Sequence, residues 1–150
     1  MTDETPRIPA RRRIDYGHSP RGDKFCTHVA YGLTCAQYDS LRDRAQDACE
    51  VCRTPDSDTV RGELIIDHYQ WMDLFFVRGL LCDRCNQVMA RHDRKVTWGP
   101  KTQPWREKAA TYHRDAWGAT PDQLALANQQ IAARTPWTRR LSGLTAQERA

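Results

Sequence analysis

The chain has 150 residues, of which 39% are hydrophobic and 28% charged, and its formal net charge is +4. This length predicts one domain with tails. The longest apolar runs, residues 74–77 and 80–81, are far shorter than the roughly 20 residues of a membrane span, and no apolar segment of a secretory signal opens the chain. We therefore expect a cytoplasmic protein without a membrane partner, whose modest positive charge permits a polyanionic partner without requiring one.

Residues 1–24 contain three prolines and the run Arg11-Arg12-Arg13, with few large apolar side chains. This composition predicts a mobile basic N-terminal arm, and it fits a phosphate-contacting arm and a plain solvated tail equally well. Ordered structure is expected from about residue 25. Thr34 followed by Gln37 predicts a capping box, and apolar residues at three- and four-residue steps after it predict an amphipathic helix of about 12 residues.

Residues 63–69 and 74–81 predict two strands that form a hairpin through a short connection at 70–73. Residues 82–95 predict a helix with Val88 and Met89 as its buried positions. Residues 98–117 form a proline-interrupted stretch of tryptophans and basic residues, which favours either DNA contact or a small aromatic core. Thr120 and Pro121 predict the start of another helix, with an apolar stripe formed by Leu124, Ala127 and Ile131.

Six cysteines are many for a chain expected in a reducing compartment, where paired cysteines indicate a metal more often than a disulfide. Cys49-x-x-Cys52 and Cys82-x-x-Cys85 form two tight pairs with 29 residues between them. Two such turns can direct four thiolates at one ion, so we predict a structural zinc site, with two disulfides or four unrelated thiols as alternatives. This zinc would support folding and leave no open position for catalysis.

Cys26 and Cys35 remain outside these pairs, with His18 and His28 nearby in the sequence. Two interpretations stay open for them, buried thiols and a second metal site. The irregular spacing favours buried thiols.

Asp67 and His68 end the first predicted strand, and Asn86 directly follows Cys85. Neighbouring strand residues point to opposite faces unless the strand ends or is bulged. Carboxylate and carboxamide oxygens are hard ligands that suit Mg²⁺ or Mn²⁺, and an adjacent imidazole can take a proton from water. The three residues therefore predict a labile metal site with a general base, with ordinary surface residues as the alternative.

Four segments carry a family resemblance: YGLTCAQYDSL (31–41), CEVC (49–52), IIDHY (65–69) and VRGLLCDRCN (77–86). In this order they resemble the phage recombination endonuclease VII family, within the His-Asn-His or ββα-metal nucleases, over roughly residues 31–91. The resemblance implies a small α+β fold, with a zinc-stabilised ββα-metal core at 25–95 and flanking helices. It also implies zinc on the four paired cysteines, Mg²⁺ or Mn²⁺ on Asp67 and Asn86, His68 as general base, and Arg78 at a phosphate.

The resemblance further implies a DNA endonuclease of branched or junction DNA in a phage or bacterial host cell. A homodimer is implied as well, with residues 96–150 as an extension for DNA contact or dimerisation. Gln70 stands where the family commonly has a second histidine, so a slower enzyme, a helper role for His92 and a loss of activity remain open. The alternative functions are a less selective nicking nuclease and a catalytically dead zinc module that binds nucleic acid or a protein.

Overall fold

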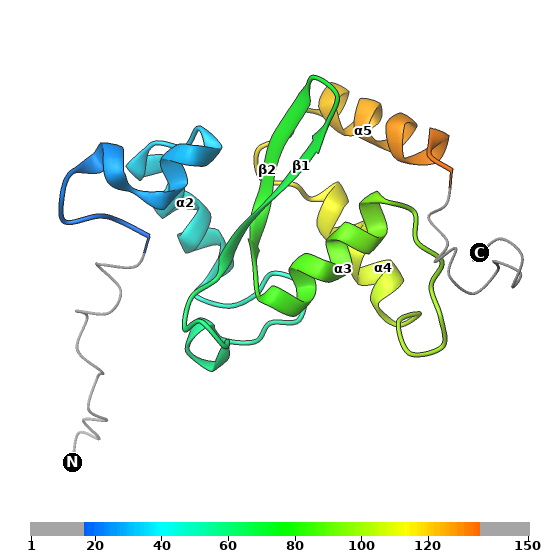
Figure 1. Cartoon of the computed structure of the whole chain (residues 1–150), viewed down its shortest axis with the longest axis horizontal. Coiled ribbons are helices and arrows are strands. Elements are labelled where there is room, and N and C mark those ends of the chain that lie inside the picture. Colours follow the sequence, from blue (N-terminus) through cyan, green and yellow to red (C-terminus); the bar gives the residue numbers. More distant parts are fainter. Residues whose placement is uncertain (1–16, 136–150) are drawn as a thin grey trace, which may run out of the picture.

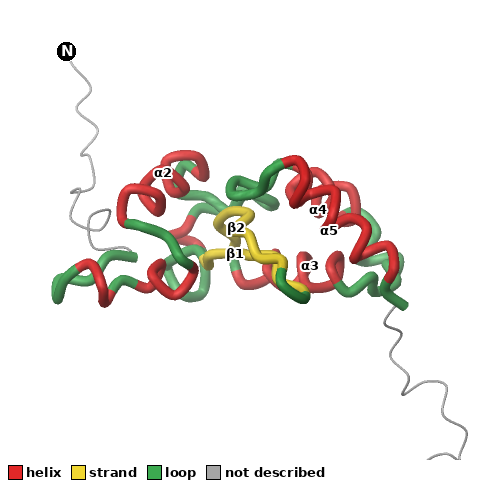
Figure 2. The backbone as a smooth tube through the Cα atoms, turned by 90° about the horizontal axis from the view of Figure 1, so that it is seen from above, coloured by secondary structure: helices red, strands yellow, loops and turns green. Residues whose placement is uncertain are grey.

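The structure, a computed structural model, describes residues 17–135. The arginine run at 11–13 and the end of the chain beyond residue 135 lie outside this range. A two-stranded hairpin forms the middle of the molecule, with short helices of the N-terminal segment on one side and three helices on the other (Figures 1 and 2). The elements in chain order are η1 (Asp23–Phe25), η2 (Thr27–Tyr31), α2 (Cys35–Ala45), η3 (Asp56–Asp58), β1 (Ile65–Trp71), β2 (Leu74–Leu81), α3 (Asp83–Asp93), α4 (Trp105–Arg114) and α5 (Pro121–Ala133).

The predicted hairpin is confirmed, although its first strand begins and ends two residues later than expected. β1 and β2 pair antiparallel from Ile65 opposite Leu81 to Trp71 opposite Leu74. The connection is therefore only two residues long, and the first of them, Met72, has a φ of 53°. A two-residue turn with positive φ follows the right-handed twist of the strands.

The register of the hairpin shifts by one residue between Asp67 and His68. Asp67 lies opposite Gly79 and His68 lies opposite Val77, so Arg78 is an extra residue without a partner in the ladder. Such a bulge bends the strand and turns the side chains next to it. It allows Asp67 and Arg78 to reach the same side of the hairpin, where their side chains meet.

The loop between α4 and α5 satisfies the backbone carbonyls at this bulge. The Trp117 N–H donates to the Arg78 carbonyl over 2.9 Å, and the Gly118 N–H donates to the Val77 carbonyl over 2.8 Å. The bulge is therefore covered by a segment that lies about 40 residues further along the chain.

Two helices begin at the capping boxes that the sequence contains. Thr34 Oγ1 accepts the Gln37 N–H over 3.1 Å, and Gln37 Oε1 accepts the Thr34 N–H over 2.9 Å. Thr120 and Gln123 repeat the arrangement at α5, which starts with a proline as predicted. Each box satisfies two backbone donors that a helix start leaves free.

The helices after the hairpin agree with the sequence in part. α3 is the predicted helix, with Met89 fully buried and Val88 half-buried. α4 was not expected, because the proline-interrupted stretch at 98–117 gave no helical pattern. The helix occupies the proline-free part of that stretch and begins directly after Pro104.

The core consists of two clusters, one around the paired cysteines and one beneath α5. The larger cluster includes Leu41, Leu80, Leu81 and Met89, which have at most 1% of their surface exposed. The partly buried tryptophans 98, 105 and 117 pack against it, so they belong to the main core and do not pack α5 onto the domain as the aromatic-core interpretation expected. The smaller cluster contains Tyr69, Leu74, Phe76, Ala116 and Ala127, with the predicted stripe residues Leu124 and Ile131 packed against it. Within residues 17–135, no helix is both long and apolar enough to cross a bilayer.

Replacing Gly118 by alanine should destabilise the fold. A Cβ at this position would lie 2.8 Å from the Val77 carbonyl oxygen, a backbone atom of the bulge that cannot rotate away. We expect a loss of roughly 1–3 kcal/mol in the free energy of unfolding, as for other overpacked sites. Urea denaturation of Gly118→Ala beside Gly99→Ala measures this, because a Cβ at Gly99 meets nothing closer than 3.9 Å. Equal stability of the two variants would contradict the close packing at the bulge.

Candidate active site and metal centre

The two cysteine pairs come together at the base of the hairpin. Their four sulfur atoms all lie within 4.8 Å of one another. The first pair lies in a turn, in which the Cys49 N–H donates to the Thr54 carbonyl over 2.9 Å. The second pair lies at the start of α3, where Cys82 is the N-cap and Cys85 belongs to the first turn. The hairpin, α3 and the turn after α2 therefore all meet at this cluster.

The donor set of this cluster fits a zinc ion. All six cysteines lie within residues 17–135 and none is in a disulfide, which rules out the disulfide alternative for this structure. The Sγ atoms of Cys52 and Cys82 are 3.7 Å apart, close to the edge of about 3.8 Å expected for tetrahedral sulfurs at about 2.3 Å from zinc.

The pKa values of the thiols also favour a metal ion at this cluster. The hydrogen bond from Cys85 lowers the pKa of Cys49 to about 4, whereas the same contact with Cys49 raises the pKa of Cys85. The sulfurs are too close for all four to carry charge without a cation. A divalent ion removes this conflict and satisfies every sulfur.

A cavity of about 480 Å³ opens beside the cluster, between β1 and α3. It brings together all the residues that the sequence singled out for catalysis. Its lining includes Asp67, His68, Gln70, Arg78 and Asn86, and also three residues that the sequence analysis did not name, Asp93, Arg94 and Arg134.

Arg78 lies between two carboxylates at the bottom of this cavity. Its Nε donates to Asp67 Oδ2 over 2.7 Å and its Nη2 donates to Asp67 Oδ1 over 3.2 Å. Nη1 and Nη2 each donate to one oxygen of Asp93 over 2.8 Å. The guanidinium is 1% exposed, so both of its edges face carboxylates. The prediction that Arg78 contacts a phosphate is not tested by this geometry.

Burial and charge act in opposite directions on these groups. Burial raises the pKa of Asp67, and the charge of Arg78 offsets only part of this effect. Burial would also raise the pKa of Asp93, but hydrogen bonding to His92 and the charge of Arg78 lower it. For Arg78, burial is outweighed by the two carboxylates, which raise its pKa. The guanidinium is therefore a permanent cation within the fold.

Two residues of α4 contact the buried groups of Asp67 and Arg78 from behind the cavity lining. The Tyr112 hydroxyl donates to Asp67 Oδ2 over 3.1 Å, and His113 Nδ1 lies 3.1 Å from Arg78 Nη1. His92, Asp93 and His113 also come close enough to hold a cation. In this structure the Arg78 guanidinium contacts both Asp93 and His113, so it supplies the positive charge there.

His68, Asn86 and Gln70 line the same cavity and are less buried than Asp67 and Arg78. His68 is the β1 residue that follows the register shift. Its ring centroid lies 5.4 Å from the ring centroids of Tyr31 and Phe75. Asn86 is half-buried in the first turn of α3, and Gln70 is exposed at the far end of β1. Asn86 and Asp67 thus line one cavity, and their role as metal ligands stays a prediction.

Three charged residues of the cavity, Asp93, Arg94 and Arg134, were not identified from the sequence. Asp93 lies seven residues after Asn86, two turns along the same face of α3, and this helical spacing was a signal for it. Arg134 follows α5, and its guanidinium lies 4.1 Å from the ring centroid of Trp71. Arg94 is exposed at the end of α3. The two arginines depend on packing between distant segments, which leaves no local pattern in the sequence.

The oxygen donors in this cavity fit a hard divalent cation. Asp67 already accepts bonds from Arg78 and Tyr112, yet each carboxylate oxygen can accept more than one partner. The carboxamide of Asn86 adds a neutral oxygen at the same cavity. Carboxylate and amide oxygens are the ligands that Mg²⁺ and Mn²⁺ prefer.

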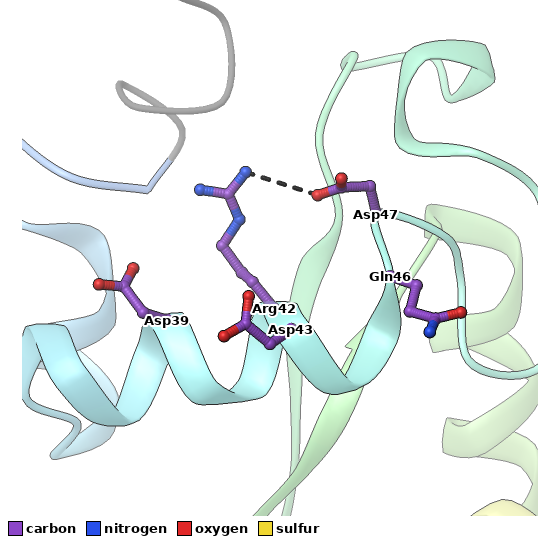
Figure 3. A pocket seen from close by; sticks show the side chains of 5 residues that line it. All are labelled: Asp39, Arg42, Asp43, Gln46 and Asp47. Carbon is purple, nitrogen blue, oxygen red and sulfur yellow. Dashed lines mark ion pairs between the residues drawn. The ribbon is translucent and has the colours of Figure 1, made fainter. Parts of the chain in front are cut away.

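A second cavity of about 380 Å³ lies along the exposed face of α2. Asp39, Arg42, Asp43, Gln46 and Asp47 line it, and Arg42 pairs with Asp47 over 3.7 Å (Figure 3). Three carboxylates against one guanidinium disfavour a phosphate there. This surface also contains none of the predicted site residues.

The fold and the site define a small α+β protein in which a two-stranded hairpin and the helix after it share a four-cysteine cluster that could hold a metal ion. The family model of recombination endonuclease VII matches residues 25–115, and the chain belongs to this family. The resemblance seen in the sequence is thereby confirmed, and the family is one of nucleases that act on branched DNA. No curated protein and no solved structure matches the chain.

Stability should fall as the pH is lowered from 6.5 to 4, in part because of His113. Burial and the charge of Arg78 lower the pKa of His113 to about 4, whereas an unfolded chain takes up this proton near pH 6.5. The stabilisation is thus complete above pH 6.5 and lost as the pH falls toward 4. His113→Gln, whose amide oxygen can still accept from Arg78, should flatten the pH dependence of the free energy of unfolding by at most about 1.4 kcal/mol per pH unit. Identical slopes for variant and wild type in urea denaturation would contradict this assignment.

Proposed function

We propose that the protein is a metal-dependent endonuclease that hydrolyses phosphodiester bonds, with branched or junction DNA as its substrate. The observation that carries the proposal is the cavity in which His68, Asp67 and Asn86 lie together beside the four-cysteine cluster. An imidazole can act as a general base and two hard oxygen donors can hold a divalent cation, and together these groups suit metal-dependent hydrolysis of a phosphodiester. Membership of the recombination endonuclease VII family supports this choice.

Asp67 and Asn86 would hold Mg²⁺ or Mn²⁺. When bound, such a cation stabilises the negative charge that develops on the phosphate and on the leaving oxygen. The four paired cysteines would hold zinc, with a structural role. Because Asn86 directly follows Cys85, the zinc would fix the first turn of α3 against the hairpin and so hold Asn86 in place relative to Asp67.

His68 is the proposed general base. It takes a proton from the attacking water at an imidazole nitrogen, which requires the neutral ring. Tyr31 and Phe75 flank the ring on two sides and limit its rotation. The position of the His68 side chain depends on the backbone at the bulge, because His68 is the first residue after the register shift.

Arg78 is proposed to act mainly as a positioning residue. Its buried contacts hold Asp67 on β1 against Asp93 on α3 and neutralise part of their charge. An anionic phosphate can then approach without facing two uncompensated carboxylates. Arg94 is exposed on the same cavity and is better placed to pair with the phosphate itself. The guanidinium of Arg134, by contrast, already donates to the Asp93 carbonyl and the Tyr69 hydroxyl.

A zinc module that binds nucleic acid without cutting it is the alternative function. Gln70 favours it, because a glutamine cannot take the part of the second histidine that the family commonly has. His92, the other candidate helper, contacts Asp93 over 3.0 Å and is not among the residues that line the cavity. The buried ion pairs of Asp67 would then serve the fold alone.

His68→Ala should reduce nicking of supercoiled plasmid in the presence of Mg²⁺ by about 10²- to 10⁴-fold, the usual effect of losing a general base. Zinc content and thermal stability equal to wild type would show that the variant folds. Added imidazole should restore part of its activity, since a free base can enter the space that the ring leaves. Wild-type protein with full zinc and no nicking activity would overturn the enzyme proposal in favour of the binding module.

The wild-type protein should cut a four-way junction at least about tenfold faster than a linear duplex of the same arms, a difference of about 1.4 kcal/mol in transition-state binding. If a homodimer forms, it should release paired cuts in opposite strands of the junction. Denaturing electrophoresis of end-labelled strands measures both. Equal rates on junction and duplex would contradict the branched-DNA substrate and leave a less selective nicking nuclease.

A further inference from the structure

Two histidines and two cysteines gather in the N-terminal segment, away from the nuclease site. His18, Cys26, His28 and Cys35 each offer one ligand atom, and these four atoms lie within 4.8 Å of one another. Cys26 and His28 are buried, and the other two are half-buried. His18 Nδ1 and Cys26 Sγ are 3.8 Å apart, near the about 3.6 Å expected for a nitrogen and a sulfur on one tetrahedral zinc ion.

His28 is held in the form that binds a metal. Its Nδ1 donates to the Leu33 carbonyl over 2.7 Å, so the lone pair of the neutral ring lies on Nε2. The side chain is 1% exposed, and Nε2 has no hydrogen-bond partner within the described residues. A buried polar atom without a partner is costly. A metal ion at the centre of the four residues would satisfy it.

His18 shows the same arrangement from the other side of the cluster. Its Nε2 lies 2.6 Å from Asp39 Oδ1 on α2, which favours a proton on Nε2 and a free lone pair on Nδ1. Nδ1 is the atom that faces Cys26. A carboxylate or carbonyl behind each histidine is the usual support of metal-binding imidazoles, and here both histidines have one.

The segment that carries these ligands has few other means of stabilisation. It contains two short 3₁₀ helices, and Phe25 and Val29 are exposed. Between residues 17 and 33 the buried side chains are those of Cys26, His28 and Leu33. A segment with so little apolar burial commonly depends on a metal or a disulfide.

We propose that His18, Cys26, His28 and Cys35 form a second structural zinc site, which fastens the N-terminal segment to the first turn of α2. Two thiolates and two neutral imidazoles balance the charge of Zn²⁺. The site is separate from the four-cysteine cluster, because Cys35 begins α2 and Cys49 follows its end. An 11-residue helix of about 16 Å lies between them.

The purified full-length chain should therefore contain two zinc ions. Elemental analysis gives the number, and X-ray absorption at the zinc edge gives the ligands. One S₄ site and one S₂N₂ site average to three sulfurs and one nitrogen per zinc. The double variant His28→Ala, Cys35→Ser should keep one zinc with sulfur ligands only, whereas His68→Ala should keep both ions as a matched histidine control.

Three other results would overturn one of the two proposed zinc sites. One zinc with four sulfurs in the wild type, and Cys26 and Cys35 free to alkylation, would overturn the second site and leave the first. Mass spectrometry that shows Cys26 and Cys35 joined in a disulfide would overturn it as well. One zinc with two nitrogens would instead overturn the four-cysteine site. If the double variant does not fold, the wild-type count and ligand average still decide.

Discussion

The site depends on the buried ion pairs that the Arg78 guanidinium forms with Asp67 and Asp93. The guanidinium joins Asp67 of β1 to Asp93 of α3 and touches His113 of α4, so three elements meet at one cation. A buried charge that loses a partner typically costs 3–5 kcal/mol, which disfavours any arrangement that separates these elements. The bulge makes the contact possible, because without the extra residue Arg78 would face away from Asp67. α4 and the segment after it are therefore part of the site, because they contact Arg78 and Asp67 and cover the bulge.

The two clusters of metal-ligating side chains lie in regions with different amounts of apolar burial. The four-cysteine cluster lies inside the larger core, and three of its cysteines are buried together with Leu81 and Met89. The N-terminal segment has no comparable core, yet it carries four metal-ligating side chains with supported histidines. Structural zinc sites supply about 10–16 kcal/mol of apparent binding energy, so two of them would anchor both ends of α2. This helix would then connect the N-terminal segment rigidly to the hairpin.

The sequence predicted those features that depend on local signals. The hairpin, α3, the start of α5 at Thr120 and Pro121 and the capping box of Thr34 and Gln37 follow from periodicity and cap residues a few positions apart, and the CxxC pairs identified their cluster. α4 was missed because prolines at 100 and 104 interrupt the pattern around it. The bulge depends on packing between β2 and the loop before α5, for which the sequence has no local signal, whereas the helical spacing of Asp93 from Asn86 was a signal that the sequence analysis did not use. The N-terminal cluster was left open because its irregular spacing matches no common zinc motif, and only the fold brings the four ligands together.

The charges around the cavity are compatible with the cation and the anionic substrate of the proposed function. Asp67 and Asp93 carry two negative charges at its base, and Arg78 returns one positive charge between them. One negative charge therefore remains among these three groups, while Arg94 and Arg134 also line the cavity. Under the proposed function, the carboxylate of Asp67 would hold the cation and the exposed Arg94 would be available to pair with a phosphate. Gln70 also lines the cavity and can donate a hydrogen bond but cannot titrate, so under the proposed function the absence of a second histidine would affect proton transfer more than binding.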